Sequence, residues 1–161
     1  MTEHVVDISR SSDEVDEEPD DSHIVDWLTS ALLQLDSSNA EVSVRIVCEK
    51  EMRSLNKRYR DMDRPTNVLS FPAGIETQDC MFLGDIVVCG AVLRKEALDF
   101  GKPLEDHYAH MVIHGLLHLL GHDHNELADQ KNMEALEKLL LASLDVADPY
   151  EPNNRPKKEI R

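Results

Sequence analysis

The feature that most constrains the fold is a cluster of histidines in the second half of the chain. His114 and His118 are four residues apart, so on a helix they share one face and lie about 6 Å apart along its axis. His124 would point away from them if the helix continued. Gly121 permits a chain reversal, because glycine adopts positive φ without steric cost. We therefore predict a helix over about 104–120 that ends at Gly121, with a positive φ there and with His124 folded back.

These three histidines form a pattern that is typical of a catalytic zinc site. The spacing H-x-x-x-H-x-x-G-x-x-H supplies three nitrogen ligands and leaves the fourth position of a tetrahedral ion open. We expect one Zn²⁺ per chain, bound by His114, His118 and His124. His122 is the less favoured alternative to His124.

Two further histidines lie on the same predicted helix. His107 is about 10 Å along the axis from His114, and His110 is about 12 Å from His118. Neither His107 nor His110 can therefore bind the same ion as His114 and His118 together. We therefore predict that they are helix-surface groups or groups that support the ligands.

The same spacing also occurs in the metzincin proteases, with one difference. Those enzymes carry a general-base glutamate where this chain has Gly115. Glycine cannot accept a proton from metal-bound water. The zinc pattern thus indicates a hydrolase, while Gly115 argues against a protease.

Charge restricts the partners of the protein. The 161 residues carry a formal net charge of −15, which excludes an overall basic surface for nucleic acid, and we expect no DNA partner. The acids concentrate before residue 23, and we predict a mobile segment at about 10–21. Three cysteines without a C-x-x-C pair fit a reducing compartment. No apolar run is long enough for a membrane span, so a cytoplasmic protein without a membrane partner is expected.

Apolar periodicity predicts a mixture of strands and helices in an α+β domain over residues 1–146, followed by a polar, disordered tail over 147–161. Too few regular β-α units are present for a doubly wound fold. We expect a mixed sheet of about four strands, near 5–8, 42–47, 68–71 and 84–89, with the third strand stopped by Pro72. Helices are expected near 24–35, 52–59, 91–98, 104–120 and 127–144.

One basic region stands out in this acidic chain. Residues 53–64 hold five basic side chains against two acids. A guanidinium binds a phosphate through two parallel hydrogen bonds and stabilises charge that develops on it. The basic side chains of this region, Arg60 among them, are candidates for this catalytic role. The alternative is that the region is a solvated helix face.

Three ordered motifs give the sequence a family resemblance. The run from His114 to His124 resembles the H-G-x-L-H-L-x-G-x-D-H signature of the bacterial YbeY family. The blocks Leu55–Arg60 with Pro65–Pro72, and Leu83–Ile86, are similar to two further elements of that family. The resemblance covers roughly residues 40–145.

The resemblance implies a zinc-dependent, single-strand-specific endoribonuclease. It implies a role in ribosomal RNA maturation, at the 3′ end of 16S RNA, and in ribosome quality control. The partners would be precursor ribosomal RNA and the ribosome or proteins associated with it. His114, His118 and His124 would hold the metal, and Arg60 matches the family's arginine near it. Two alternatives remain open: a metalloprotease-like zinc hydrolase, and a ribosome-assembly factor in which zinc is only structural.

Overall fold

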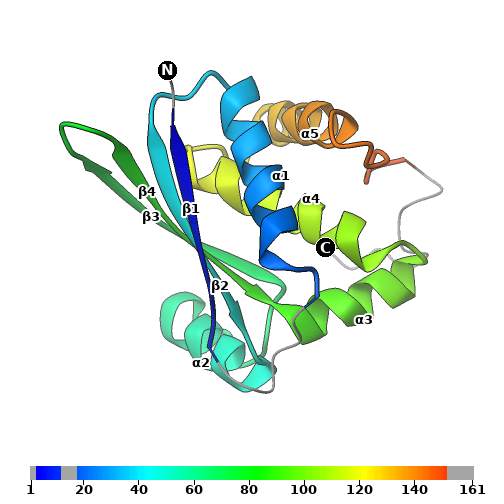
Figure 1. Cartoon of the computed structure of the whole chain (residues 1–161). Helices are drawn as coiled ribbons and strands as arrows, with labels where there is room; N and C mark the ends of the chain where they lie inside the picture. The colour runs from blue at the N-terminus through cyan, green and yellow to red at the C-terminus, as the bar shows by residue number, and fades with distance from the viewer. Residues whose placement is uncertain (1–2, 12–17, 152–161) are drawn as a thin grey trace.

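A four-stranded mixed sheet organises the fold (Figure 1). The structure is a computed structural model and describes residues 3–11 and 18–151. The strand order is β1-β2-β4-β3; β1, β2 and β4 are parallel, and β3 runs antiparallel to β4. The strands are β1 (His4–Arg10), β2 (Ala40–Val47), β3 (Val68–Glu76) and β4 (Met81–Cys89). The helices are α1 (Asp21–Gln34), α2 (Glu49–Arg60), α3 (Gly90–Phe100), α4 (Leu104–Leu119) and α5 (Leu127–Ala142). The predicted α+β class and the four-stranded mixed sheet are confirmed.

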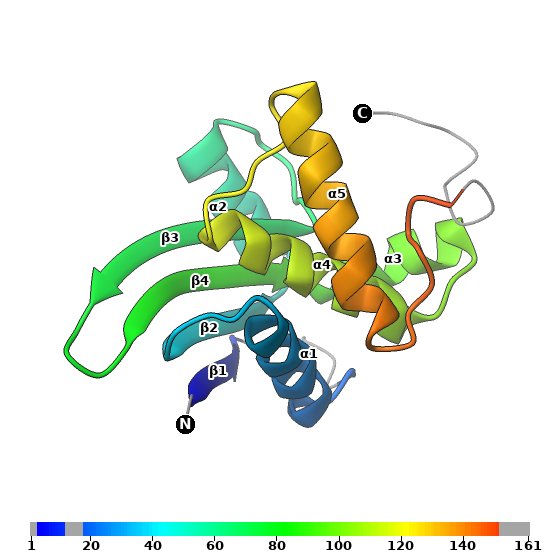
Figure 2. The ribbon, with the colours of Figure 1, turned by 90° about the horizontal axis from the view of Figure 1, so that it is seen from above.

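Helices cover both faces of this sheet, because side chains alternate between the faces along each strand. Val44 and Ile86 belong to the large core that also contains α1 and α4. Val87 packs in a smaller cluster with Met52 of α2. Figure 2 shows α1 and α4 in front of the sheet and α2 behind it. The helix that carries the histidine cluster and the helix that carries Arg60 thus lie on opposite faces.

Helix α4 is the central helix of the larger layer. Eleven of its sixteen residues are buried, including polar ones. It packs against β3 and β4 on one side and against α1, α3 and α5 on the others. This position fixes its orientation, so the histidines at its C-terminal end are presented from a rigid element.

The third strand differs from the sequence prediction, because Pro72 does not stop it. β3 continues to Glu76 with a register shift between Pro72 and Ile75. Proline is tolerated here because β3 is an edge strand and needs no amide donor toward a further neighbour. Gly84 lies opposite Pro72 at φ 137°, where a Cβ would come within 2.2 Å of the Phe71 carbonyl oxygen. The close approach of strands β3 and β4 explains why this position is a glycine.

The predicted mobile segment at 10–21 is described only at its two ends, and residues 12–17 lie outside the described residues. The Arg10 guanidinium donates to the Pro19 carbonyl at 2.8 Å and to the Asp21 carboxylate at 2.9 Å. Asp20 caps α1 by accepting from the His23 amide. The two ends of the segment are thus tied together at the start of α1.

The predicted polar tail over 147–161 is likewise described only in part. Residues 152–161 lie outside the described residues, whereas 147–151 are placed beside α4 and α5. Tyr150 reaches Glu137 of α5. In the described part of the chain, no helix is long and apolar enough to cross a membrane.

Candidate metal centre

The end of α4 brings three histidines together. His114 and His118 lie one turn apart, with their Nε2 atoms 3.1 Å from each other. After Leu119 the helix stops, and the His122 amide donates back to the Leu117 carbonyl at 3.0 Å. Gly121 has φ 98°, as predicted, and a Cβ there would meet nothing within 4 Å. The reversal places the His124 ring 5.2 Å from the His118 ring, measured between centroids.

The three rings fit a tetrahedral metal ion. Each residue offers a ring nitrogen, and these atoms all lie within 4.8 Å of one another. At the usual Zn–N distance of 2.0–2.1 Å, two ligands of a tetrahedral ion are about 3.3 Å apart, close to the separation of the two α4 nitrogens. Burial, together with the neighbouring His114 and His124, lowers the pKa of His118 to about 4. His118 is therefore neutral near pH 7, the form in which imidazole binds a metal.

Gly115, beside the first of these histidines, is required by packing. A Cβ at this position would lie 2.8 Å from Ile86 Cγ2 and 3.1 Å from the Ser70 hydroxyl. The same hydroxyl donates to the Gly115 carbonyl at 2.9 Å. The helix thus lies against β3 and β4 with no space for a carboxylate side chain, so a protease-type general base cannot occupy this position.

Glu137 of α5 is a candidate functional residue that the sequence analysis missed. Its side chain is fully buried and accepts from His114 Nδ1 at 2.5 Å. This bond fixes the proton on Nδ1 and leaves the Nε2 lone pair of His114 free for a metal. Burial raises the pKa of Glu137, but hydrogen bonds from His110 and His114 outweigh burial and bring that pKa to about 2. The carboxylate is therefore ionised, and it orients a candidate ligand.

The same carboxylate holds two further groups. The Tyr150 hydroxyl donates to Glu137 Oε2, and His110 Nε2 lies 3.3 Å from the same oxygen. His110, His114 and Glu137 form a second group of side chains that are close enough to share an ion. Because Glu137 already accepts from both histidines and from Tyr150, we assign it to hydrogen bonding.

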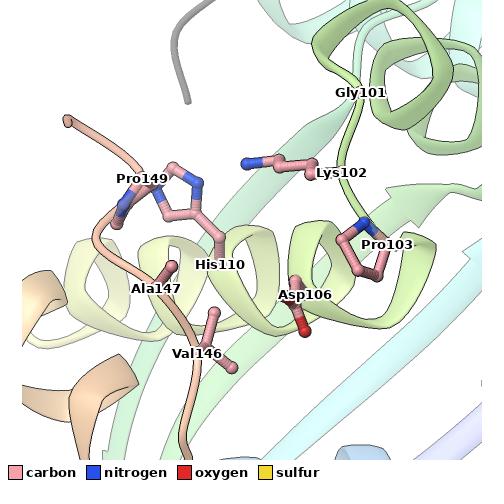
Figure 3. Close-up of a pocket in the computed structure, with 8 residues that line it drawn as sticks. All are labelled: Gly101, Lys102, Pro103, Asp106, His110, Val146, Ala147 and Pro149. Atoms are coloured by element: carbon pink, nitrogen blue, oxygen red, sulfur yellow. The ribbon is translucent and has the colours of Figure 1, made fainter. Parts of the chain in front are cut away.

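A small cavity of about 140 Å³ is lined in part by His110 (Figure 3). Lys102, Asp106 and the segment 146–149 line it. Figure 3 shows a ring nitrogen of His110 turned toward the Lys102 ammonium. The cavity is therefore adjacent to the hydrogen-bond network, whereas the three converging histidines are partly open to solvent.

Of the two roles predicted for His107 and His110, the helix-surface position is wrong for both, since both are buried. The other role, support of the ligands, fits His110, which shares Glu137 with His114. His107 Nε2 lies 2.8 Å from the Glu96 carboxylate, which also accepts from the Asn67 amide. His110 belongs to the Glu137 network. Carboxylates from α3 and α5 thus make their burial possible, and sequence periodicity on α4 alone carries no sign of these partners.

Comparison with known proteins identifies the family. Residues 6–145 match the family described as Endoribonuclease YbeY. The chain belongs to the YbeY family. It is 50% identical over 139 residues to Endoribonuclease YbeY of Cellvibrio japonicus, covering 86% of this chain and 78% of that protein. It is 48% identical over 147 residues to Endoribonuclease YbeY of Pseudomonas putida (strain F1), covering 90% and 92%.

A solved structure supports the fold assignment. The solution structure of TM1509 from Thermotoga maritima is similar with a TM-score of 0.58, over 98% of this YbeY-family chain and 100% of that one. Sequence identity is 23%. The likeness therefore concerns the arrangement of the sheet and helices.

Arg60 lies apart from the histidines in this YbeY-family chain. It is the last residue of α2 and is exposed. Helix α2, which carries Arg60, and α4, which carries His114 and His118, pack on opposite faces of the sheet. His122 is half-buried and belongs to neither group of potential metal ligands among the described residues.

Proposed function

We propose that this protein is a metal-dependent endoribonuclease that cleaves single-stranded RNA in ribosomal RNA maturation, at the 3′ end of 16S RNA, and in ribosome quality control. The observation that carries the proposal is the convergence of three imidazoles on one open position, beside a glycine that admits no side chain. The relatives named Endoribonuclease YbeY support RNA as the substrate.

The proposed metal is one Zn²⁺ per chain, held by His114, His118 and His124. Three neutral imidazoles with an open fourth position are the ligand set of a catalytic zinc site. When bound, zinc supplies a Lewis acid for a phosphate oxygen and lowers the pKa of coordinated water towards about 7.

The protein's own residues would then orient the metal and the substrate. The Glu137 carboxylate holds the His114 ring with its Nε2 facing His118, where it would be free to bind the ion. Arg60 would bind the scissile phosphate and stabilise the charge that develops on it. No carboxylate side chain fits at position 115, so this position supplies no general base. The attacking oxygen would be either a water activated by the bound metal or the 2′-hydroxyl of the RNA itself.

The proposed partners follow from the charge. A chain with a net charge of −15 gains little from counterion release when it binds free RNA. We therefore expect the ribosome or a ribosome-associated protein in the cytoplasm to deliver the substrate. The alternatives are less well supported: Gly115 disfavours a protease, and the open coordination position disfavours a purely structural zinc.

Metal analysis combined with RNA cleavage tests the proposal. Wild type is expected to contain one zinc per chain and to cleave single-stranded RNA, with activity lost in chelator and restored by zinc. His118→Ala is expected to lose both metal and cleavage. Equal zinc in the two proteins would refute the ligand assignment. Cleavage that persists in excess chelator would refute metal dependence, and a casein assay run in parallel tests the protease alternative.

A further inference from the structure

We propose that the C-terminal end of α2 is a binding surface for single-stranded RNA on which a nucleobase stacks against Tyr59. This inference rests on the proposed function and specifies where its substrate binds. Nucleobase stacking on an aromatic side chain, flanked by basic groups that follow the phosphates, is a general means of binding single strands.

The first observation is the exposure of Tyr59. The residue is 56% exposed, although aromatic residues are only 4% of this sequence. It makes an edge-to-face contact with Phe71 of β3, with centroids 5.0 Å apart and planes at 67°. Phe71 in turn packs on the small core cluster beneath α2. The Tyr59 side chain is thus held at one side by the fold, while more than half of the residue is exposed.

The second observation is the charge around this ring. The Arg58 guanidinium lies 5.4 Å from the Tyr59 centroid. Lys57 and Arg60 are exposed on the same last turn of α2. The nearby Asp63 carboxylate accepts two hydrogen bonds from Arg53, at 2.7 and 3.1 Å, which offsets its charge. A strongly acidic protein therefore presents an aromatic ring among cations at this place.

The third observation connects this surface with the metal centre. Ser70 and Phe71 are consecutive residues of β3, so their side chains point to opposite faces of the sheet. Ser70 donates to Gly115 beside the histidines, and Phe71 contacts Tyr59 on the other face. β3 is the edge strand, so nothing in the sheet lies beyond it. An RNA strand that stacks on Tyr59 reaches the metal centre by passing around this edge, next to Arg60.

The test compares two short 2′-O-methyl oligonucleotides, which lack the reactive hydroxyl: one with bases, and one of the same length with abasic positions. Affinity is measured by fluorescence anisotropy with metal-loaded protein. Tyr59→Leu is expected to weaken binding of the base-containing oligonucleotide about five- to hundredfold, the effect of losing one stacked base. Tyr59→Phe is expected to bind as wild type does. The abasic oligonucleotide is expected to bind Tyr59→Leu and wild type equally, because phosphate contacts remain.

Leu98→Ala is the matched control, since Leu98 is a large apolar side chain with 78% exposure on α3. It is expected to bind both oligonucleotides as wild type does. Tyr59→Trp provides a second readout that does not depend on a loss of affinity: stacking is expected to quench its added fluorescence when base-containing RNA binds. Absence of quenching in the bound state would overturn the proposal.

The outcomes separate this inference from the proposed function. If wild type cleaves RNA and Tyr59→Leu binds both oligonucleotides as wild type does, the stacking surface is refuted and the nuclease proposal stands. If Tyr59→Leu selectively loses affinity for bases but wild type does not cleave RNA, the surface stands and the nuclease proposal fails. Equal binding of the two oligonucleotides by wild type also overturns the stacking surface.

Discussion

Substitution of Glu137 is expected to weaken metal binding although Glu137 is not proposed as a ligand. The carboxylate is fully buried and accepts from His114, His110 and Tyr150. In Glu137→Gln the amide oxygen can still accept from His114. The amide nitrogen then faces the two remaining groups, and the negative charge that strengthened all three bonds is gone.

The magnitude follows from these bonds. A hydrogen bond to a charged group contributes about 1.5–3 kcal/mol and one between neutral groups about 0.5–1.5 kcal/mol, so neutralisation weakens the bond that holds His114 by roughly 1–1.5 kcal/mol. Loss of the partner that orients a metal-binding histidine typically lowers metal affinity ten- to hundredfold, or about 1.4–2.7 kcal/mol. We expect zinc affinity in Glu137→Gln to fall by an amount in this range.

The assay is competition for zinc with a chromophoric chelator, supported by thermal unfolding to show that the fold persists. Glu134→Gln is the matched control: it removes the same charge one turn earlier on α5, where the carboxylate accepts a surface hydrogen bond from Gln130. Wild-type affinity in Glu137→Gln would refute the orienting role. An equal loss in the two variants would assign the effect to net charge.

Three further predictions concern other parts of the site. Arg60→Ala is expected to keep its zinc but to lower single-turnover RNA cleavage roughly 10²–10³-fold, the effect of losing one preorganised charge stabiliser; a wild-type rate at saturating RNA would reduce Arg60 to a surface charge. Gly121→Val is expected to weaken zinc binding while most of the fold persists, because a branched residue at φ 98° costs about 1–3 kcal/mol although no atom obstructs its Cβ; normal zinc affinity would show that this turn does not position His124. Gly115→Ala is expected to lower the free energy of unfolding by about 1–3 kcal/mol through the contact with Ile86; an unchanged or raised melting temperature would contradict the packing argument.

The sequence predicted the local features of the candidate metal centre because they depend on neighbouring residues. The spacing of His114 and His118 and the reversal at Gly121 follow from helical geometry and from the freedom of glycine. The alternation along β2 likewise indicated which side chains face the core, and the structure buries Val42, Val44 and Ile46.

The features that sequence could not predict depend on contacts between distant segments. Pro72 looks like the end of a strand until β3 is known to be an edge strand. His107 and His110 look like surface groups until Glu96 and Glu137 are placed against them. Glu137 lies among the apolar repeats of α5, where a carboxylate in the sequence carries no sign that it faces a histidine on another helix. The one available signal was its place among leucines, at a position that the helical repeat buries.

The Glu137 carboxylate that supports the histidines comes later in the sequence than the histidines themselves. The order of synthesis therefore affects when the site is complete. All three candidate ligands are translated within a single short stretch, His114 to His124, whereas Glu137 and Tyr150 follow later. Because a growing chain folds from its N-terminal part onward, a nascent chain that ends before Glu137 holds every candidate ligand but lacks the group that fixes the His114 tautomer. Loading of the proposed zinc in its final geometry is therefore expected to be a late event in translation, and a C-terminal truncation before Glu137 is expected to yield a protein that keeps the histidine signature but binds zinc poorly.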